Sequence, residues 1–179
     1  YTAALLLASC EKNDPEDQFP VYFPGDTSTG QVWATKSQTD WTASVRAVYH
    51  ANDPNYLAFL ANTYTSEGDL RESLEISFMP LDTGTYAIDR ISHIQPEGGI
   101  NAYYATTRGD GDAAEDYYLI DTTATDNYLR LVKSDTVTGE FEGFFTCTFV
   151  VDTRFGPKIN RLHPNKIKFS NGHFKFKVN

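Results

Sequence analysis

The chain has 179 residues, and its 15 basic against 24 acidic side chains give a formal net charge of -9 at pH 7. This acidity argues against nucleic acid as a partner, because binding to phosphate backbones depends on clustered lysine and arginine. Aromatic residues make up 14% of the chain, with 12 Phe, 11 Tyr and a single Met, which is typical of strands rather than helices.

The N-terminal residues indicate export and lipid attachment. Residues 2–9 are apolar or small, about the length of a signal-peptide core and shorter than the ~20 residues that a membrane helix needs. They lead into Leu7-Ala8-Ser9-Cys10, which resembles the lipobox at which bacterial lipoprotein precursors are cleaved and acylated on cysteine. The alternative is a buried strand or helix end over residues 3–10, with Cys10 as a core thiol.

The residues after Cys10 are typical of a solvated tether. They contain Pro15 and four acidic side chains, namely Glu11, Asp14, Glu16 and Asp17. Acidic residues at this position resemble the surface-export signal of Bacteroidota lipoproteins, and an acylated cysteine carrying several chains would anchor stably. We therefore expect a signal-peptide remnant (1–9), a lipidated tether (10–30) and a single β domain (31–179), exported and held on the outer membrane, surface-exposed, by membrane lipid.

Alternation of apolar and polar residues predicts an all-β domain. Over 41–49 the odd positions are apolar and the even ones mostly polar, the period of a sheet with one solvated face. Similar short runs cover 57–61, 74–78, 84–89, 100–106, 117–120, 128–133 and 137–151. Turn residues recur between them without helical periodicity, so we expect an antiparallel β-sandwich or a calycin-like β-barrel.

The C-terminal residues predict a hairpin. Asn171-Gly172 is the strongest short turn signal in the chain and favours a type I′ turn between two alternating runs. That turn would pair Phe169 with Phe174 and Ile167 with Phe176, with all four on one apolar face. The solvated face would then carry Lys166, Lys168, Lys175 and Lys177, either as ordinary surface or edge protection or as a patch for an anionic ligand.

Catalytic motifs are not visible, and neither an enzyme nor a cofactor is expected. There is no Gly-x-Ser-x-Gly elbow, and Cys147 lies on the same predicted strand face as Phe145 and Phe149, where a thiol is inert. A pair of carboxylates for glycoside hydrolysis would leave no mark in sequence spacing. No two of the four histidines, His50, His93, His163 and His173, have the spacing of metal ligands on one element.

The acidic segment after Arg108 is the best metal candidate. Its carboxylates, interspersed with glycine, are Asp110, Asp112, Glu115 and Asp116. Such hard oxygen ligands could wrap a calcium ion, although the spacing is not that of an EF-hand. The alternative is ordinary hairpin-tip chemistry, in which Gly and Asp form the turn.

Five tyrosines are candidate ligand-binding residues: Tyr103, Tyr104, Tyr117, Tyr118 and Tyr128. Adjacent residues of a strand face opposite sides, so each Tyr-Tyr pair must place one ring on each side. The rings could stack on sugars, form a protein interface or line a cavity, and the alternative is that they pack beneath loops.

A family resemblance can be drawn from several of these segments. Besides the tether they are Trp33-Ala34-Thr35, Gly84-Thr85-Tyr86, Val137 to Phe144 and Ile167 to Phe174. Together they resemble small Bacteroidota surface lipoproteins of a domain-of-unknown-function family, a resemblance that implies no catalytic residues. The expected function is a binding or accessory module for a glycan, a small hydrophobe or a protein. The alternatives are a structural or adhesin component that assembles through a β-edge, and a lipid-anchored hydrolase.

Overall fold

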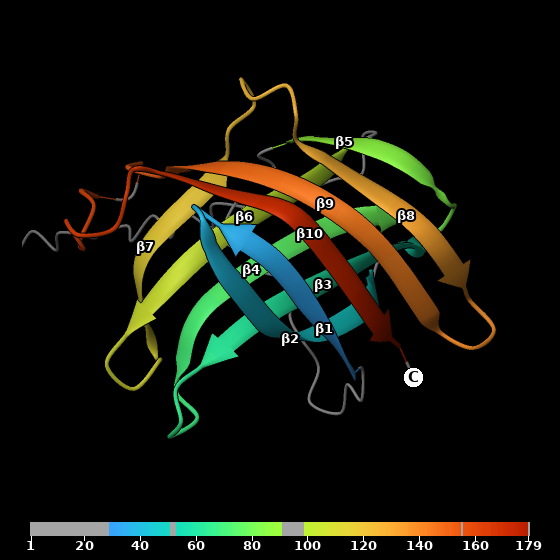
Figure 1. The fold of residues 1–179 in the computed structure, drawn as a ribbon, viewed down its shortest axis with the longest axis horizontal. Helices are drawn as coiled ribbons and strands as arrows, with labels where there is room; N and C mark the ends of the chain where they lie inside the picture. The colour runs from blue at the N-terminus through green and yellow to red at the C-terminus, as the bar shows by residue number, and fades with distance from the viewer. Residues whose placement is uncertain (1–28, 51–52, 91–98, 155, 179) are drawn as a thin grey trace, which may run out of the picture.

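The computed structural model describes residues 29–50, 53–90, 99–154 and 156–178, and these form ten strands with no helix among them (Figure 1). The strands are β1 (Thr29–Lys36), β2 (Thr39–His50), β3 (Asp53–Tyr64), β4 (Leu70–Pro80), β5 (Gly84–Arg90), β6 (Ile100–Arg108), β7 (Ala113–Ile120), β8 (Tyr128–Asp135), β9 (Glu140–Val151) and β10 (Lys166–Lys177). The all-β prediction is confirmed.

The strands belong to one sheet that closes on itself. Strand β10 pairs with both β1 and β9, and β7 bridges β6 and β9, so the ring runs β1-β2-β3-β4-β6-β7-β9-β10. Of the two predicted architectures this closed ring corresponds to the barrel. Each of the ten strands has a neighbour on both sides over part of its length, whereas residues 113–117 of β7 pair only with β6 and residues 133–135 of β8 pair only with β9.

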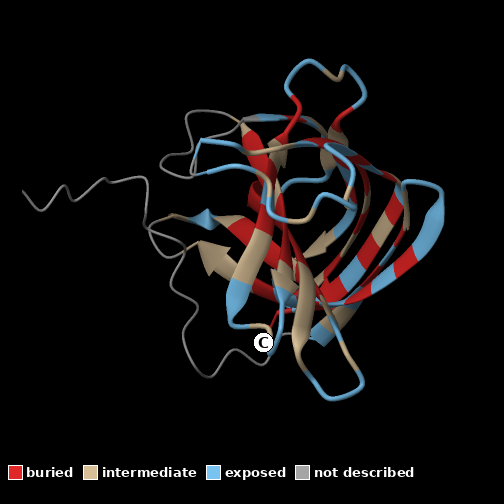
Figure 2. Ribbon diagram, turned by 90° about the vertical axis from the view of Figure 1, so that its left-hand side faces the viewer, coloured by how far each residue is buried: buried red, intermediate tan, exposed pale blue. Residues whose placement is uncertain are grey.

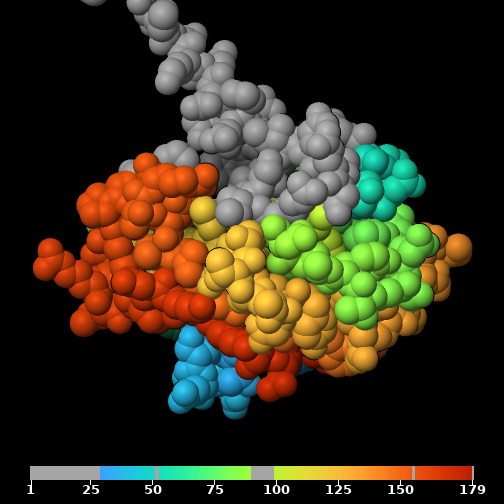
Figure 3. Space-filling model, turned by 90° about the horizontal axis from the view of Figure 1, so that it is seen from above, coloured from blue at the N-terminus to red at the C-terminus, as the bar shows by residue number. Residues whose placement is uncertain are grey.

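The ring is forked where β7 and β8 meet β9. The C-terminal part of β9 pairs with β7 from Phe149 onward, whereas its N-terminal part pairs with β8. Strand β8 continues to β5, which joins β6 as the only parallel pair among the described strands. On the face seen in Figure 3, the β7–β8 connection lies between β5 and the connection from β9 to β10.

Alternating burial along the strands shows why this sequence forms a barrel (Figure 2). In β2 every second residue from Trp41 to Ala47 is buried and those between are exposed. The interior is filled with aromatic side chains, since seven of its fully or almost fully buried members are Phe59, Phe141, Phe145, Phe149, Phe169, Phe174 and Phe176. The prediction that Cys147 faces the core is confirmed, and burial raises the pKa of its thiol, which keeps it unreactive.

The predicted C-terminal hairpin is wrong, because residues 166–177 form one strand. Between Phe169 and Gly172 the register of β10 shifts by one residue against β9, and Asn171 has φ +52°, which together define a β-bulge. The bulge moves the inward positions from odd to even numbers, so Ile167, Phe169, Phe174 and Phe176 share the core face, as the apolar pattern requires. Lys168 and Lys175 therefore lie along one strand and do not face each other.

A second bulge moves Phe78 out of the position that alternation predicts. Between Leu57 and Phe59 of β3, the facing strand β4 contains one extra residue, and Phe78 has φ +58°. Met79 takes the core position, while the ring of Phe78 packs on His50 with centroids 4.4 Å apart. The alternating pattern also predicts that the polar residues of this strand face solvent. Glu75 is instead fully buried and accepts a hydrogen bond from Ser77 Oγ.

Candidate functional site

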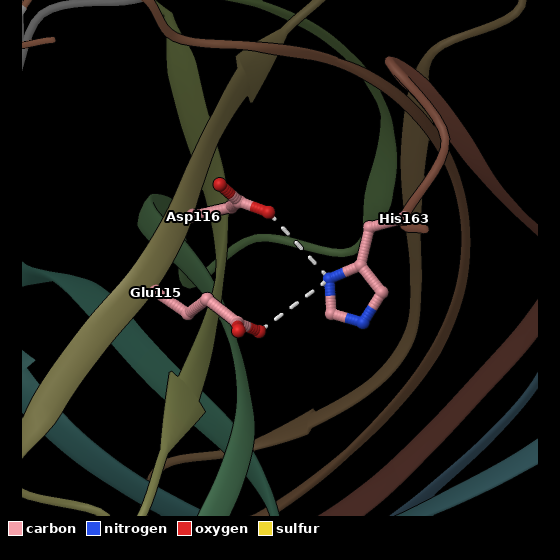
Figure 4. A group of neighbouring side chains, drawn as sticks. All are labelled: Glu115, Asp116 and His163. Atoms are coloured by element: carbon pink, nitrogen blue, oxygen red, sulfur yellow. Dashed lines mark ion pairs between the residues drawn. The ribbon is translucent and has the colours of Figure 1, made fainter. Parts of the chain in front are cut away.

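Two carboxylates and one imidazole meet at one end of the barrel (Figure 4). Glu115 and Asp116 come from β7, and His163 comes from the connection between β9 and β10. Nδ1 of His163 lies 3.6 Å from Asp116 Oδ2 and 3.8 Å from Glu115 Oε2. These three residues are the one group of three or more potential metal ligands found in the described part of the chain, with all three donor atoms within 4.8 Å of one another.

The carboxylates also fasten the β9–β10 connection to the barrel. Asp116 has a side chain only 1% exposed and accepts a hydrogen bond at Oδ1 from the backbone N–H of Ile159, at 2.7 Å. Glu115 Oε2 accepts from the side-chain amide of Asn160 at 3.1 Å. Tyr118, which points into the same end of the barrel, donates its hydroxyl to the carbonyl of Pro164. The position of His163 is therefore set by the chain on both sides of it.

The predicted acidic loop is shorter than the sequence suggests, and its carboxylates are divided. Strand β7 already begins at Ala113, so Glu115 and Asp116 belong to a strand, whereas Asp110 and Asp112 lie exposed in the turn before it. Asp110 Oδ1 accepts from the backbone N–H of Asp112, which is ordinary turn chemistry. The structure brings His163 to the first pair and leaves the other two acids outside the ligand group.

The candidate tyrosines separate by face, as strand geometry predicts. Tyr104 and Tyr118 point into the core, where their rings pack with centroids 5.6 Å apart, and Tyr117 is 40% exposed. Burial, reinforced by the charges of Asp116 and Glu115, raises the pKa of Tyr118 to about 12. Tyr103 lies half-buried on the other face, where burial raises its pKa, and Tyr128 is half-buried beside Thr146. The rings of Tyr104 and Tyr118 fill the described interior together with the phenylalanines. They therefore do not form the wall of an open cavity there.

A polar network closes the interior at the same end. The carboxylate of Glu72 accepts hydrogen bonds from the Lys36 ammonium, the Trp41 indole N–H and, at 2.8 Å, the Tyr104 hydroxyl. Burial acts to raise the pKa of Glu72, but the bonds and the positive charge of Lys36 outweigh it and hold the pKa below the ordinary value of 4.5. Every group in this network is paired, so its role is structural.

A hollow of about 410 Å³ lies on the outer wall of β9 and β10. Its lining residues are Ser37, Gln38, Ala124, Asp126, Thr148, Lys166 and Lys168, of which only Ala124 is an apolar residue type. Lys166 is held by Asp121 at 2.7 Å, and the hydrogen bonds from Lys166 and Thr123 lower the pKa of Asp121 to about 2. The second lysine forms an ion pair with Asp126, in which the two side chains are 47% and 54% exposed.

One group in the hollow lacks a partner. Thr148 is 3% exposed and its Oγ1 makes no hydrogen bond, although buried hydroxyls are normally satisfied. Its backbone is fully used, since its N–H donates to the side chain of Asn127 and its carbonyl accepts from Asp121. A ligand in the hollow would meet two ammonium groups, each paired with an aspartate, and would lie beside the Thr148 hydroxyl, whose Oγ1 is itself buried.

Sequence reasoning missed His163, Thr148 and Glu72 as interacting groups, because their partners lie far away along the chain. His163 follows Asp116 by 47 positions, and no local pattern links them. The C-terminal lysines, which the sequence offers as a possible patch for an anionic ligand, do point to the hollow. Lys166 and Lys168 line it, whereas Lys175 lies further along the same strand.

Comparisons with known proteins leave the family open: no family model, no curated protein and no solved structure matches the chain. A search of the described residues finds no helix with the length and apolar character needed to cross a bilayer. The predicted acylation site, Cys10, and residues 11–28 of the predicted tether lie outside the described residues, as does His93, whereas Thr29 and Gly30 already belong to β1.

Proposed function

We propose that this protein is a membrane-anchored surface lipoprotein whose barrel binds a small, acidic, hydroxyl-rich ligand, such as an acidic sugar, in the hollow beside Lys166 and Lys168. The observation that carries the proposal is the unpartnered hydroxyl of Thr148, which is buried at the edge of this hollow. A buried hydroxyl without a partner costs free energy, and a ligand hydroxyl or carboxylate would supply the missing bond.

The composition of the hollow favours an anion over an apolar ligand. Two lysines, two hydroxyl residues, one amide and one carboxylate line it, and of its seven lining residues only Ala124 is apolar. The exposed ion pair between Lys168 and Asp126 holds little free energy, because solvent screens it, so an incoming carboxylate can replace Asp126 at small cost. The aromatic packing of the barrel interior directs binding to the outer wall instead.

The test is titration of the folded domain with D-glucuronate, using D-glucose as the neutral counterpart. We expect saturable binding of glucuronate and at least tenfold weaker binding of glucose, because a charge-assisted hydrogen bond is worth roughly 1.5–3 kcal/mol. Lys168→Gln should weaken glucuronate binding by about tenfold, and Thr148→Val should weaken it while raising stability, because it removes an unpartnered buried hydroxyl. Chemical shift changes in two-dimensional NMR would locate the site and give the affinity.

Lys175→Gln is the matched control, since Lys175 is an exposed lysine of the same strand outside the hollow. It should bind glucuronate like the wild type. Equal binding of glucose and glucuronate, or equal losses in Lys168→Gln and Lys175→Gln, would contradict the proposed site and leave only diffuse attraction to positive charge.

The anchor is tested separately in cells that process bacterial lipoproteins. Metabolic labelling with an acyl-chain analogue should mark the full-length protein, whereas Cys10→Ala should remain unlabelled and appear in the soluble fraction. The variant Cys147→Ala is the control, because Cys147 is buried in the barrel and cannot be acylated there. Label that persists in Cys10→Ala would rule out acylation at this position.

A further inference from the structure

The geometry of Glu115, Asp116 and His163 points to a metal rather than to hydrogen bonding. The distances from His163 Nδ1 to the two carboxylate oxygens, 3.6 and 3.8 Å, exceed the ~3.2 Å limit of a good N–H···O bond. They are close to the roughly 3.3–3.6 Å that separates ligand atoms around a tetrahedral zinc ion with bonds of ~2.0–2.2 Å. Nδ1 itself is buried and has no hydrogen-bond partner.

Charge balance supports the same conclusion. Glu115 and Asp116 are 17% and 1% exposed, and among the described residues neither forms an ion pair with lysine or arginine. Two carboxylates held together in a partly dehydrated place repel each other unless a cation lies between them. A divalent ion would neutralise both, whereas a protonated His163 would neutralise one.

We propose that Glu115, Asp116 and His163 bind a zinc ion, through one carboxylate oxygen of each acid and Nδ1 of the imidazole, with a solvent molecule as the fourth ligand. The imidazole nitrogen selects the metal, since calcium takes oxygen ligands and zinc accepts nitrogen and oxygen together. The site thus differs from the calcium loop predicted from sequence both in its ligands and in its ion.

Hydrogen bonds from neighbouring residues hold the two carboxylates in place, whereas the group that faces Nε2 of His163 does not suit a metal at Nδ1. The backbone N–H of Ile159 donates to Oδ1 of Asp116 at 2.7 Å, and the backbone N–H of Asn160 donates at 3.3 Å to Oδ2, the oxygen that faces the imidazole. Asn160 is held by the Leu162 N–H at its Oδ1, so its Nδ2 faces both Glu115 and Nε2 of His163, the latter at 3.3 Å. Metal at Nδ1 requires a proton on Nε2, which then faces the amide donor of Asn160 and would be better served by an acceptor.

Isothermal titration of the folded domain with ZnCl₂ in a non-chelating buffer near pH 7.5 tests the proposal. One zinc ion should bind per chain, and CaCl₂ should bind at least 100-fold more weakly. His163→Gln should lower zinc affinity by about 100-fold or more, beyond the 10- to 100-fold cost of losing a residue that only hydrogen-bonds a ligand. Asn160→Asp, which gives Nε2–H an acceptor, should raise the affinity by about tenfold.

His173→Gln is the matched control, because His173 also lies beside a carboxylate. Its Nε2 is 2.9 Å from Glu142, and its ring is stacked between Trp33 and Phe144, so its partners are already in place. Zinc affinity should stay within about twofold of the wild type in this variant. Zinc binding that survives in His163→Gln, or that falls equally in the two variants, would overturn the assignment. Weaker binding by Asn160→Asp would contradict the role of Nδ1.

Discussion

Replacing Gly172 by alanine is expected to lower the free energy of unfolding by about 3 kcal/mol, because the added methyl group has no space beside the bulge of β10. A Cβ at this position would lie 2.5–2.6 Å from three ring atoms of Phe145, which is itself fully buried. The ring cannot yield without displacing the aromatic core around it. Urea denaturation followed by tryptophan fluorescence would measure the loss as a lower midpoint.

The neighbouring residue provides the control for this prediction. Asn171 has φ +52° and is exposed, so Asn171→Gly keeps a residue suited to that conformation and removes no buried contact. Its urea midpoint should stay close to that of the wild type. If Gly172→Ala were equally well tolerated, the close contact between β10 and Phe145 would not exist in solution.

Glu72→Gln is expected to destabilise the barrel by about 3 kcal/mol, since it removes the one negative charge on which Lys36, Trp41 and Tyr104 converge. The amide cannot accept from all of these donors, and one of its own N–H groups would face them. Urea unfolding at pH 7 measures the loss. The exposed pair of Lys133 and Glu140 is the control, and Glu140→Gln should barely change the midpoint.

The effect of Glu72→Gln should also depend on pH. Folding lowers the pKa of Glu72, so the network contributes fully above the ordinary value of 4.5 and loses its contribution as the pH falls through the lower folded-state pKa. The stability difference between the wild type and the variant should therefore be constant near neutrality and shrink in acid. A difference that grows below pH 4 would mean that Glu72 is not the charged partner.

The alternation of apolar and polar residues predicts the strands and their inward faces well, because neighbouring residues within one strand are enough to show which side is buried. The apolar residues of the last strand illustrate its limit. Ile167 and Phe169 are odd-numbered while Phe174 and Phe176 are even-numbered, so the pattern requires one extra residue between them. A tight hairpin and a β-bulge both meet that requirement, and only the pairing of β10 with β1 and β9 distinguishes them.

The candidate sites were less predictable than the strands, because their groups meet only through the fold. The sequence predicts Glu115 and Asp116 as possible ligands together with Asp110 and Asp112. In the structure β7 begins at Ala113, so the first two residues lie in the strand and the other two in the turn before it. Their nitrogen partner, His163, reaches them through a connection that carries no regular pattern. The unpartnered Thr148 hydroxyl is likewise a property of packing and has no mark in the sequence.

Closure of the ring between β1 and β10 makes folding depend on the last of the described strands. Thr29 at the start of β1 pairs with Lys177 at the end of β10, so the contact that completes the sheet spans almost the whole described length. Such a pairing is slow to form, since most of the chain must be ordered before the two ends meet. A chain emerging N-terminus first keeps one edge of β1 unpaired until the twelve residues of β10 arrive. Loss of β10 would leave β1 and β9 each with an unpaired edge, which favours aggregation.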